Sequence, residues 1–445
     1  MLHTVLRPIV RHALRVYFRE LELEGIEDVP ATGPLLLAPN HPNTLIDVFL
    51  VGAYLDRKLR FVAKSTLFKG PTGPLLRALN AVPIARREDG PGADAQANNQ
   101  QTLAACERAV ADGDAVLIFP EGVSQEEPRL QPLKTGLARI ALGAQQRTQE
   151  PVYVVPVALI YDERETFRSR ARVAFTQPID VRPFLAGADD ADPFAPARAL
   201  TAAVRDALQT EVVHVEQPEN DPLVAQLDQL YGQQVRHEIG GRLAATAAIA
   251  RAVSAFAERD PERVQRVRGQ LAAYTQALDA AGLDDRALRR GKVPSPQEDL
   301  AFWAATPLAL WGALNHLLYY QLPRIAVALL GPERLYTSTV KLVVGLIALA
   351  GCYVGQTWAL QHYLGWRWAG PYLGTLPLTG FIALLWLEAL HARRRRRGTR
   401  KALRRLSPSA RRALQDQREA LIRELDRARV DYLAERLEAD PDRSA

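Results

Sequence analysis

A histidine and an aspartate lie close together in this sequence, directly after an apolar run. His41 and Asp47 follow the strand-like stretch Pro-Leu-Leu-Leu-Ala at 34–38, with five residues between them. A turn from a buried strand into a helix would bring the imidazole and the carboxylate together. This pair is typical of a general base held by an orienting acid, which can take a proton from a hydroxyl group. Taken alone, such a spacing is more often a helix-capping contact, so the chemistry depends on companion motifs.

Three further motif blocks follow along the chain, and the second of them has two parts, at 119–122 and 132–136. Val-Pro-Ile-Ala-Arg occupies 82–86, and Phe-Pro-Glu-Gly occupies 119–122 at the end of a second strand-like run. Pro-Leu-Lys-Thr-Gly comes after it at 132–136, and Val-Val-Pro-Val is found at 154–157. Together with the histidine motif they form an ordered set, which is a far more specific signal than any one of them.

The ordered motifs resemble those of the glycerolipid acyltransferase family, over roughly residues 20–182. The resemblance implies an O-acyltransferase that moves a fatty acyl group from a thioester, acyl-CoA or acyl-carrier protein, onto a glycerol hydroxyl at a membrane surface. The hydroxyl would attack the thioester directly, so no acyl-enzyme is required. No metal and no bound cofactor is expected, because the thioester is a co-substrate. The oligomeric state stays open.

The resemblance also assigns roles to individual residues. His41 is the expected catalytic base and Asp47 its partner. Family members usually have four residues between these two positions, whereas this chain has five. Asp47 therefore reaches His41 only if the turn absorbs the extra residue. Arg86 is expected to contact the acceptor phosphate, because a planar guanidinium binds phosphate oxygens in pairs, and Lys134 is expected to support it.

Glu121, Gly122 and Asn40 complete the expected substrate-binding set. Glu121 would position a hydroxyl group of the acceptor, and Gly122 would permit a close approach of the backbone. Asn40 opens the histidine motif. A purely structural turn at 120–122 remains the alternative for the glutamate and the glycine.

The motifs also bear on the acceptor. The form Asn-His-Pro-Asn at 40–43, with its longer spacing, resembles glycerol-3-phosphate and dihydroxyacetone-phosphate acyltransferases. Val123-Ser124-Gln125 stands where the lysophosphatidate branch usually has threonine and arginine. We therefore expect glycerol-3-phosphate or dihydroxyacetone phosphate as acceptor in phospholipid biosynthesis. A 1-acylglycerol-3-phosphate acyltransferase is the alternative, and a non-catalytic membrane scaffold that retains the fold is the alternative from another class.

Strand-like runs alternate with helical stretches through the region of the motifs. Several of these runs are almost continuously apolar, as strands covered on both faces are. This pattern predicts an α/β acyltransferase domain, layered around a mixed sheet, at 25–193. Residues 194–300 are rich in Ala, Leu and Arg and predict a helical region whose role we cannot infer. The six expected strands lie at 35–38, 59–63, 81–84, 115–119, 152–160 and 172–175.

A membrane region is predicted at 301–391. Residues 342–360 and 368–387 contain no Asp, Glu, Lys, Arg or His, and each approaches the roughly 20 residues of a spanning helix. Two spans would form a helical hairpin. The interrupted apolar segment 302–322 is expected to be re-entrant or interfacial, because a third span would move the following arginines to the other side.

The C-terminal segment 392–445 is predicted to be a basic helical tail. It holds 17 Lys and Arg residues against 9 Asp and Glu residues, and begins with five arginines at 393–397. Arginines next to a span favour the cytoplasmic side and anionic lipid headgroups. We therefore expect an integral membrane protein with a cytoplasmic catalytic domain, at the inner membrane if the source is bacterial, and no nucleic-acid partner. The helix beyond residue 407 is expected to be solvated.

The N-terminal segment 1–24 is predicted to be an amphipathic interfacial helix. Arginines recur at every fourth residue between apolar positions, which also interrupts any signal-peptide core. The alternative is an ordinary amphipathic helix that covers the catalytic domain. With only two cysteines, Cys106 and Cys352, neither a disulfide framework nor a cysteine-rich zinc site is expected.

Overall fold

The chain forms two compact units. The computed structural model describes residues 2–69, 73–78, 80–84, 93–124, 130–186, 192–212, 220–239, 242–288 and 296–439. The first unit contains residues 1–213 together with 323–346, and the second contains residues 214–322 and 347–445.

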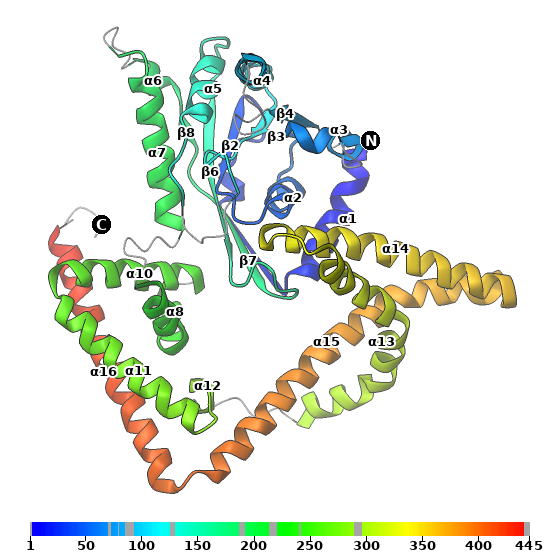
Figure 1. Ribbon diagram of the computed structural model, residues 1–445, viewed down its shortest axis with the longest axis vertical. Coiled ribbons are helices and arrows are strands. Elements are labelled where there is room, and N and C mark those ends of the chain that lie inside the picture. The colour runs from blue at the N-terminus through cyan, green and yellow to red at the C-terminus, as the bar shows by residue number, and fades with distance from the viewer. Residues whose placement is uncertain are drawn as a thin grey trace. The chain divides into compact units, whose positions relative to one another are not determined.

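A mixed sheet forms the centre of the first unit (Figure 1). The strand order is β1-β7-β6-β2-β5-β3-β4, with β8 paired to β6. All of these pairs are parallel except β6–β7 and β6–β8, which are antiparallel. The strands are β1 (Glu20–Glu24), β2 (Leu35–Pro39), β3 (Leu59–Lys64), β4 (Ala81–Ile84), β5 (Ala115–Leu117), β6 (Tyr153–Tyr161), β7 (Arg170–Phe175) and β8 (Ile179–Asp180). The six expected strands are confirmed to within a few residues, and so is the layered α/β class.

Helices cover both faces of this sheet, so each face has its own core (Figure 1). Leu35 and Leu37 of β2 face the helices α1 and α2, whereas Leu36 and Ala38 face α4, α5 and α7. This alternation explains why β2 is apolar at every position: it is buried on both sides. The helices are α1 (Leu2–Tyr17), α2 (Leu45–Tyr54), α3 (Gly73–Ala78), α4 (Ala93–Ala111), α5 (Gly136–Gln145), α6 (Arg182–Ala186) and α7 (Ala195–Glu211).

The domain boundaries differ from the expected ones at both ends. Leu200, Val204 and Leu208 of α7 are fully buried in the core shared with α5, so the first unit extends well past residue 193. At the N-terminal end, α1 stops at Tyr17 and residues 20–24 form β1, an edge strand, instead of continuing a helix.

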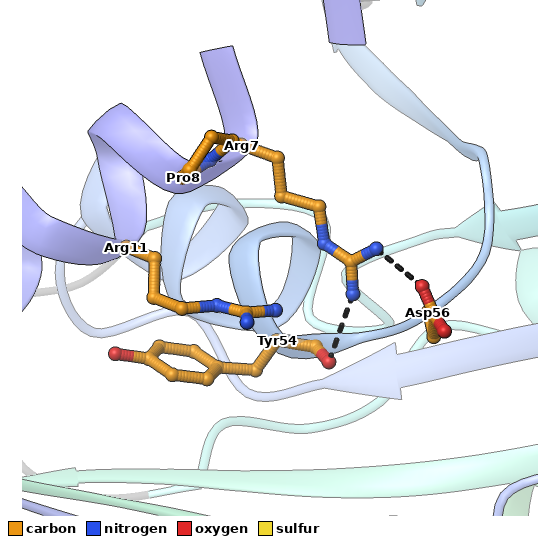
Figure 2. A pocket seen from close by; sticks show the side chains of 5 residues that line it. All are labelled: Arg7, Pro8, Arg11, Tyr54 and Asp56. Carbon is orange, nitrogen blue, oxygen red and sulfur yellow. Dashed lines mark hydrogen bonds and ion pairs between the residues drawn. The ribbon is translucent and has the colours of Figure 1, made fainter. Parts of the chain in front are cut away.

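Helix α1 packs against α2. Leu14, Tyr17 and Phe18 are buried in the core, so this side of the segment covers the sheet of the first unit. Figure 2 shows the shallow pocket between the two helices, where the guanidinium of Arg7 donates to the carbonyl of Tyr54 and pairs with Asp56 at 2.5 Å. Arg11 donates twice to the carbonyl of Ala53, at 2.8 and 3.1 Å. Both arginines therefore cap the C-terminus of α2, whose last carbonyls have no partner within the helix. Contact of the exposed side of α1 with a membrane stays a prediction.

The second unit is helical. The charged helix at the C-terminus is not simply solvated, because Leu414, Leu421 and Leu425 are buried. Arg263 of α11 pairs with Glu424 at 3.0 Å and with Asp431 at 2.7 Å, so the helix after residue 407 packs on the helical region instead. The helices after residue 213 are α8 (Asp221–Leu230), α9 (Gly232–Ile239), α10 (Arg242–Arg259), α11 (Pro261–Ala280), α12 (Asp285–Leu288), α13 (Pro296–Leu330), α14 (Thr337–Leu364), α15 (Trp366–Arg405) and α16 (Pro408–Ala439). The end of α13 and the start of α14, within 323–346, belong to the first unit.

The expected membrane region consists of three long helices, α13, α14 and α15. By length and composition alone, residues 334–364 and 366–405 could each cross a membrane. Helix α13 is continuous, without the break that a re-entrant loop needs, so the re-entrant interpretation of 302–322 is wrong and the interfacial one stays a prediction. Along α15, the ring of Trp386 stacks on Phe302 of α13 at 5.2 Å.

Candidate active site

The sheet topology brings the motifs to one edge. Strands β2, β5, β3 and β4 are neighbours and run parallel, so their carboxyl ends lie along the same edge of the sheet. His41 follows the end of β2, and the turn 119–122 follows the end of β5. Ligands bind at this edge in open α/β sheets. The sequence therefore places its chemically useful side chains where such a sheet binds substrates.

His41 and Asp47 form a hydrogen-bonded pair. The Nδ1 atom of His41 lies 2.9 Å from Oδ2 of Asp47, and the aspartate is fully buried in the first turn of α2. The His41 ring stacks on Phe119, with 3.5 Å between ring centroids and 14° between planes. Since Nδ1 is directed at the carboxylate, Nε2 is the nitrogen that can accept a proton. The His41 side chain is 12% exposed, so the ring is held firmly yet reachable.

The buried carboxylate of Asp47 receives two more hydrogen bonds. The backbone N–H of Asn43 donates to Oδ2 at 2.7 Å, and the hydroxyl of Tyr161 donates to Oδ1 at 2.5 Å. Burial, together with the nearby negative charge of Asp47, raises the pKa of Tyr161 well above its usual value, so this hydroxyl remains a donor. Together these donors stabilise a charge that would otherwise be costly to bury.

The turn between His41 and Asp47 contains one residue with an unusual backbone conformation, Thr44. Its backbone has φ +48° and ψ −119°, a conformation that β-branched residues rarely adopt. Backbone strain of this kind costs about 1–3 kcal/mol and persists only where the surroundings hold it. The turn thus satisfies the condition on which the assignment of Asp47 depends.

Glu121 links the two turns at the edge of the sheet. One of its carboxylate oxygens accepts a hydrogen bond from the backbone N–H of His41 at 3.0 Å. The side chain is only 4% exposed. Burial raises the pKa of Glu121 to about 7, against the opposing effect of hydrogen bonds from the backbone of His41 and Gln131. The carboxyl group can therefore gain or lose a proton near neutral pH.

Gly122 and Lys134 lie in contact at the same turn. Gly122 has φ +74°, and a Cβ atom added to it would lie 2.8 Å from the Nζ of Lys134. The backbone N–H of Lys134 donates to the carbonyl of Pro120 at 2.8 Å, which holds the lysine segment against the turn. Only glycine adopts this φ without strain and fits here without displacing the lysine.

Asn40 and Arg86 differ from the rest of the expected set. The Asn40 side chain accepts from the N–H of Leu159 at 2.6 Å and donates to its carbonyl at 3.0 Å, so the buried amide holds the catalytic loop against β6. These contacts hold the loop in place, and a contact of Asn40 with substrate stays a prediction. Arg86 lies outside the described residues. Strand β4, which precedes it, ends at Ile84 on the same sheet edge.

Comparison with known proteins agrees with this geometry. Residues 20–160 match the family model described as Acyltransferase. The matched segment is thus similar to acyltransferases over the region of the motifs, which is consistent with the glycerolipid acyltransferase family. The prediction made from the four motifs is thereby confirmed.

The relatives that this segment matches are named for different acceptors. The 1-acyl-sn-glycerol-3-phosphate acyltransferase alpha of Mus musculus is 24% identical over 174 residues, which are 39% of this chain and 56% of the mouse protein. Glycerol-3-phosphate O-acyltransferase 2 of Saccharomyces cerevisiae is 48% identical over 65 residues, which are 14% of this chain and 9% of the yeast protein. The chain thus spans about half, or much less, of the length of these curated relatives.

A solved structure is also similar. It is the crystal structure of the 1-acyl-sn-glycerophosphate acyltransferase from Thermotoga maritima, which is 19% identical in sequence. The match covers 47% of this chain and 78% of that one, with a TM-score of 0.35.

Sequence reasoning missed two residues that support the acyltransferase site. Tyr161, at the end of β6, donates to Asp47, and Arg164 donates to the carbonyl of Pro42 at 3.1 Å. Both lie more than a hundred residues from their partners, so no local spacing could reveal the contacts. A tyrosine at the carboxyl end of a central strand was the only available signal.

Proposed function

We propose that the protein is a membrane-bound O-acyltransferase that transfers a fatty acyl group from acyl-CoA or acyl-carrier protein to glycerol-3-phosphate or dihydroxyacetone phosphate in phospholipid biosynthesis. The observation that carries the proposal is the pair of His41 and Asp47, at 2.9 Å, beside the turn that contains Glu121 and Gly122. A base, its orienting acid and an acceptor-binding turn meet at one edge of the sheet.

The chemistry needs one proton transfer in each direction. As the acceptor oxygen attacks the thioester carbonyl, Nε2 of His41 takes the hydroxyl proton. The imidazolium that forms is stabilised by the carboxylate of Asp47, which Asn43 and Tyr161 hold in place by donating hydrogen bonds to it. When the tetrahedral intermediate collapses, the C–S bond breaks and the thiolate takes the proton back from His41. Such general-base assistance contributes about 100-fold to 10,000-fold in rate.

Phosphate recognition is assigned to Lys134 and Arg86. Lys134 lies over Gly122, next to the turn that is hydrogen-bonded to the histidine loop, so its ammonium can pair with an acceptor phosphate close to the base. Arg86 follows the strand β4 on the same edge and would add a bidentate contact.

The choice of glycerol-3-phosphate is supported by the Asn-His-Pro-Asn motif and by the local identity to the yeast glycerol-3-phosphate acyltransferase. Transfer to 1-acylglycerol-3-phosphate is the second candidate, favoured by the longer match to the mouse enzyme. We further propose that α14 and α15 form a membrane hairpin that keeps both the catalytic domain and the arginines 393–397 in the cytoplasm, at the inner membrane if the source is bacterial.

An acceptor panel tests the function. The purified full-length protein is mixed with one acyl-CoA in detergent, and release of free thiol is followed with glycerol-3-phosphate, dihydroxyacetone phosphate, lysophosphatidate or no acceptor. We expect thiol release that depends on an acceptor and is fastest with one of the first two. A tenfold preference for lysophosphatidate in kcat/KM, equivalent to about 1.4 kcal/mol, would overturn the acceptor assignment. No release with any acceptor would favour the scaffold alternative.

A further inference from the structure

The first turns of α14 contact the catalytic loop within the first unit. The hydroxyl of Thr44, between His41 and Asp47, lies 2.8 Å from the hydroxyl of Thr339. It also lies 3.5 Å from the carbonyl of Leu335, in the short 3-10 helix Arg334–Tyr336 that precedes α14. Apolar contacts run alongside, because Leu342 is buried in the same core as α1 and α2. The base of the apolar helix is therefore packed into the site.

A second set of contacts links the same helix to the loop after β6. The hydroxyl of Ser338 donates to the carbonyl of Arg164 at 2.6 Å, and the ammonium of Lys341 donates to the carbonyl of Glu165 at 2.6 Å. Arg164 in turn donates to the carbonyl of Pro42, which follows the catalytic histidine. Helix α14 thus reaches the histidine motif by two routes, directly through Thr44 and indirectly through Arg164.

The direct route meets the strained point of the motif. Thr44 has a positive φ, which a threonine adopts only when its surroundings impose it. The hydrogen bonds described for its hydroxyl both go to the segment 335–339. Thr44 lies within the turn that brings Asp47, three residues later, to His41 across the longer spacing.

We propose that Thr339 is a positioning residue for acyl transfer: by holding Thr44 in its positive-φ conformation, the base of the apolar helix α14 sets the geometry of the His41–Asp47 pair. This inference rests on the proposed function. Thr339 acts through Thr44 and touches no substrate, so its loss changes the rate of the chemical step more than the binding of either substrate. The packing of the base of α14 against Thr44 and the formation of the His41–Asp47 pair therefore occur together.

Two substitutions at Thr339 separate the hydroxyl from the packing. Thr339→Val keeps the branched shape and removes the hydrogen bond, whereas Thr339→Ser keeps the hydroxyl. We expect Thr339→Val to lower kcat about tenfold with both KM values within twofold of the parent, and Thr339→Ser to stay within twofold in kcat. An unchanged kcat in Thr339→Val, or a raised KM at constant kcat, would overturn the proposal.

A double substitution distinguishes positioning from simple anchoring. Glycine adopts positive φ without strain, so in a Thr44→Gly background the turn no longer depends on Thr339. We expect Thr339→Val to change kcat less than twofold in that background, against tenfold in the parent. Equal losses in both backgrounds would mean that Thr339 acts independently of Thr44, which contradicts the proposal.

The same set of variants tests the contact without relying on activity. Thermal unfolding of the full-length variants in detergent should show that Thr339→Val lowers the midpoint more in the parent than in the Thr44→Gly background. If the parent releases no thiol with any acceptor, the proposed function fails while this coupling can still be observed. If Thr339→Val lowered the midpoint equally in both backgrounds, the proposed coupling between Thr44 and Thr339 would be wrong, whatever the activity of the variants.

Discussion

Replacement of Glu121 by glutamine should change how the stability of the protein depends on pH. Burial raises the pKa of this carboxyl group from 4.5 to about 7. The folded protein therefore holds a proton on Glu121 between about pH 4.5 and pH 7, where the unfolded chain has already lost it. The contribution of this group to stability is fully present below about pH 4.5 and is lost as the pH rises through about 7.

The size of the effect follows from the shift. Each unit of pKa corresponds to about 1.4 kcal/mol, so a rise from 4.5 to about 7 amounts to about 3 kcal/mol of unfolding free energy. In Glu121→Gln the side chain keeps an oxygen that can accept from the backbone N–H of His41, yet carries no titratable proton. Relative to the parent, the variant should therefore gain stability as the pH rises from 5 to 8.

Thermal unfolding of the full-length protein and of Glu121→Gln in detergent, at several pH values from 5 to 8, measures this difference. A change of about 3 kcal/mol corresponds to roughly 6 to 12 °C in midpoint for a unit of this size. The midpoint of the variant should rise relative to the parent across this range and then level off. A difference between the two proteins that stays constant with pH, or that falls as the pH rises, would refute the assignment of a buried, proton-holding glutamate.

Further outcomes follow from the site and from the apolar helices. Tyr161→Phe should lower kcat several-fold and cost about 1.5–3 kcal/mol of unfolding free energy, because the buried carboxylate of Asp47 loses a donor; equal activity and stability in denaturation and kinetic assays would contradict this. Arg86→Ala should raise the KM of the phosphate-bearing acceptor more than that of the acyl donor in steady-state assays, whereas equal effects would indicate a folding role. Cysteines introduced at 363–367 should be labelled by an impermeant reagent from outside the membrane, and those beside 393–397 should not; labelling of both from one face would eliminate the hairpin.

The sheet could be predicted largely from local patterns. Strands β2 and β6 are apolar at almost every position, and a strand buried on both faces needs just that pattern. Strand β1 was missed although Glu-Leu-Glu-Leu-Glu alternates with the period of a strand, because arginines at helical spacing precede it and suggested one continuous helix. The predicted domain boundary at 193 was wrong because α7 has the same Ala-rich composition as the helices of the second unit. Composition does not reveal which core a helix joins.

Some contacts of the candidate site could likewise be predicted from the sequence, and others could not. The pairing of His41 with Asp47, and the meeting of 119–122 with the histidine loop, could be predicted because each motif follows a parallel strand of one sheet. The donor at Tyr161 and the support from Thr339 could not, since those contacts join residues 114 and 295 positions apart. Asn40 was expected to touch substrate, and only the geometry of β6 reveals that its amide is used by Leu159.

The central claim is that His41 is the general base of an acyl transfer, and His41→Ala tests it most directly. Thiol release from acyl-CoA in the presence of glycerol-3-phosphate should fall by roughly 100-fold to 10,000-fold, while expression, membrane insertion and the unfolding midpoint stay close to those of the parent. The histidine side chain is partly accessible and stacks on one ring, so its removal should leave the fold intact. Turnover within a few-fold of the parent in this variant would contradict the account.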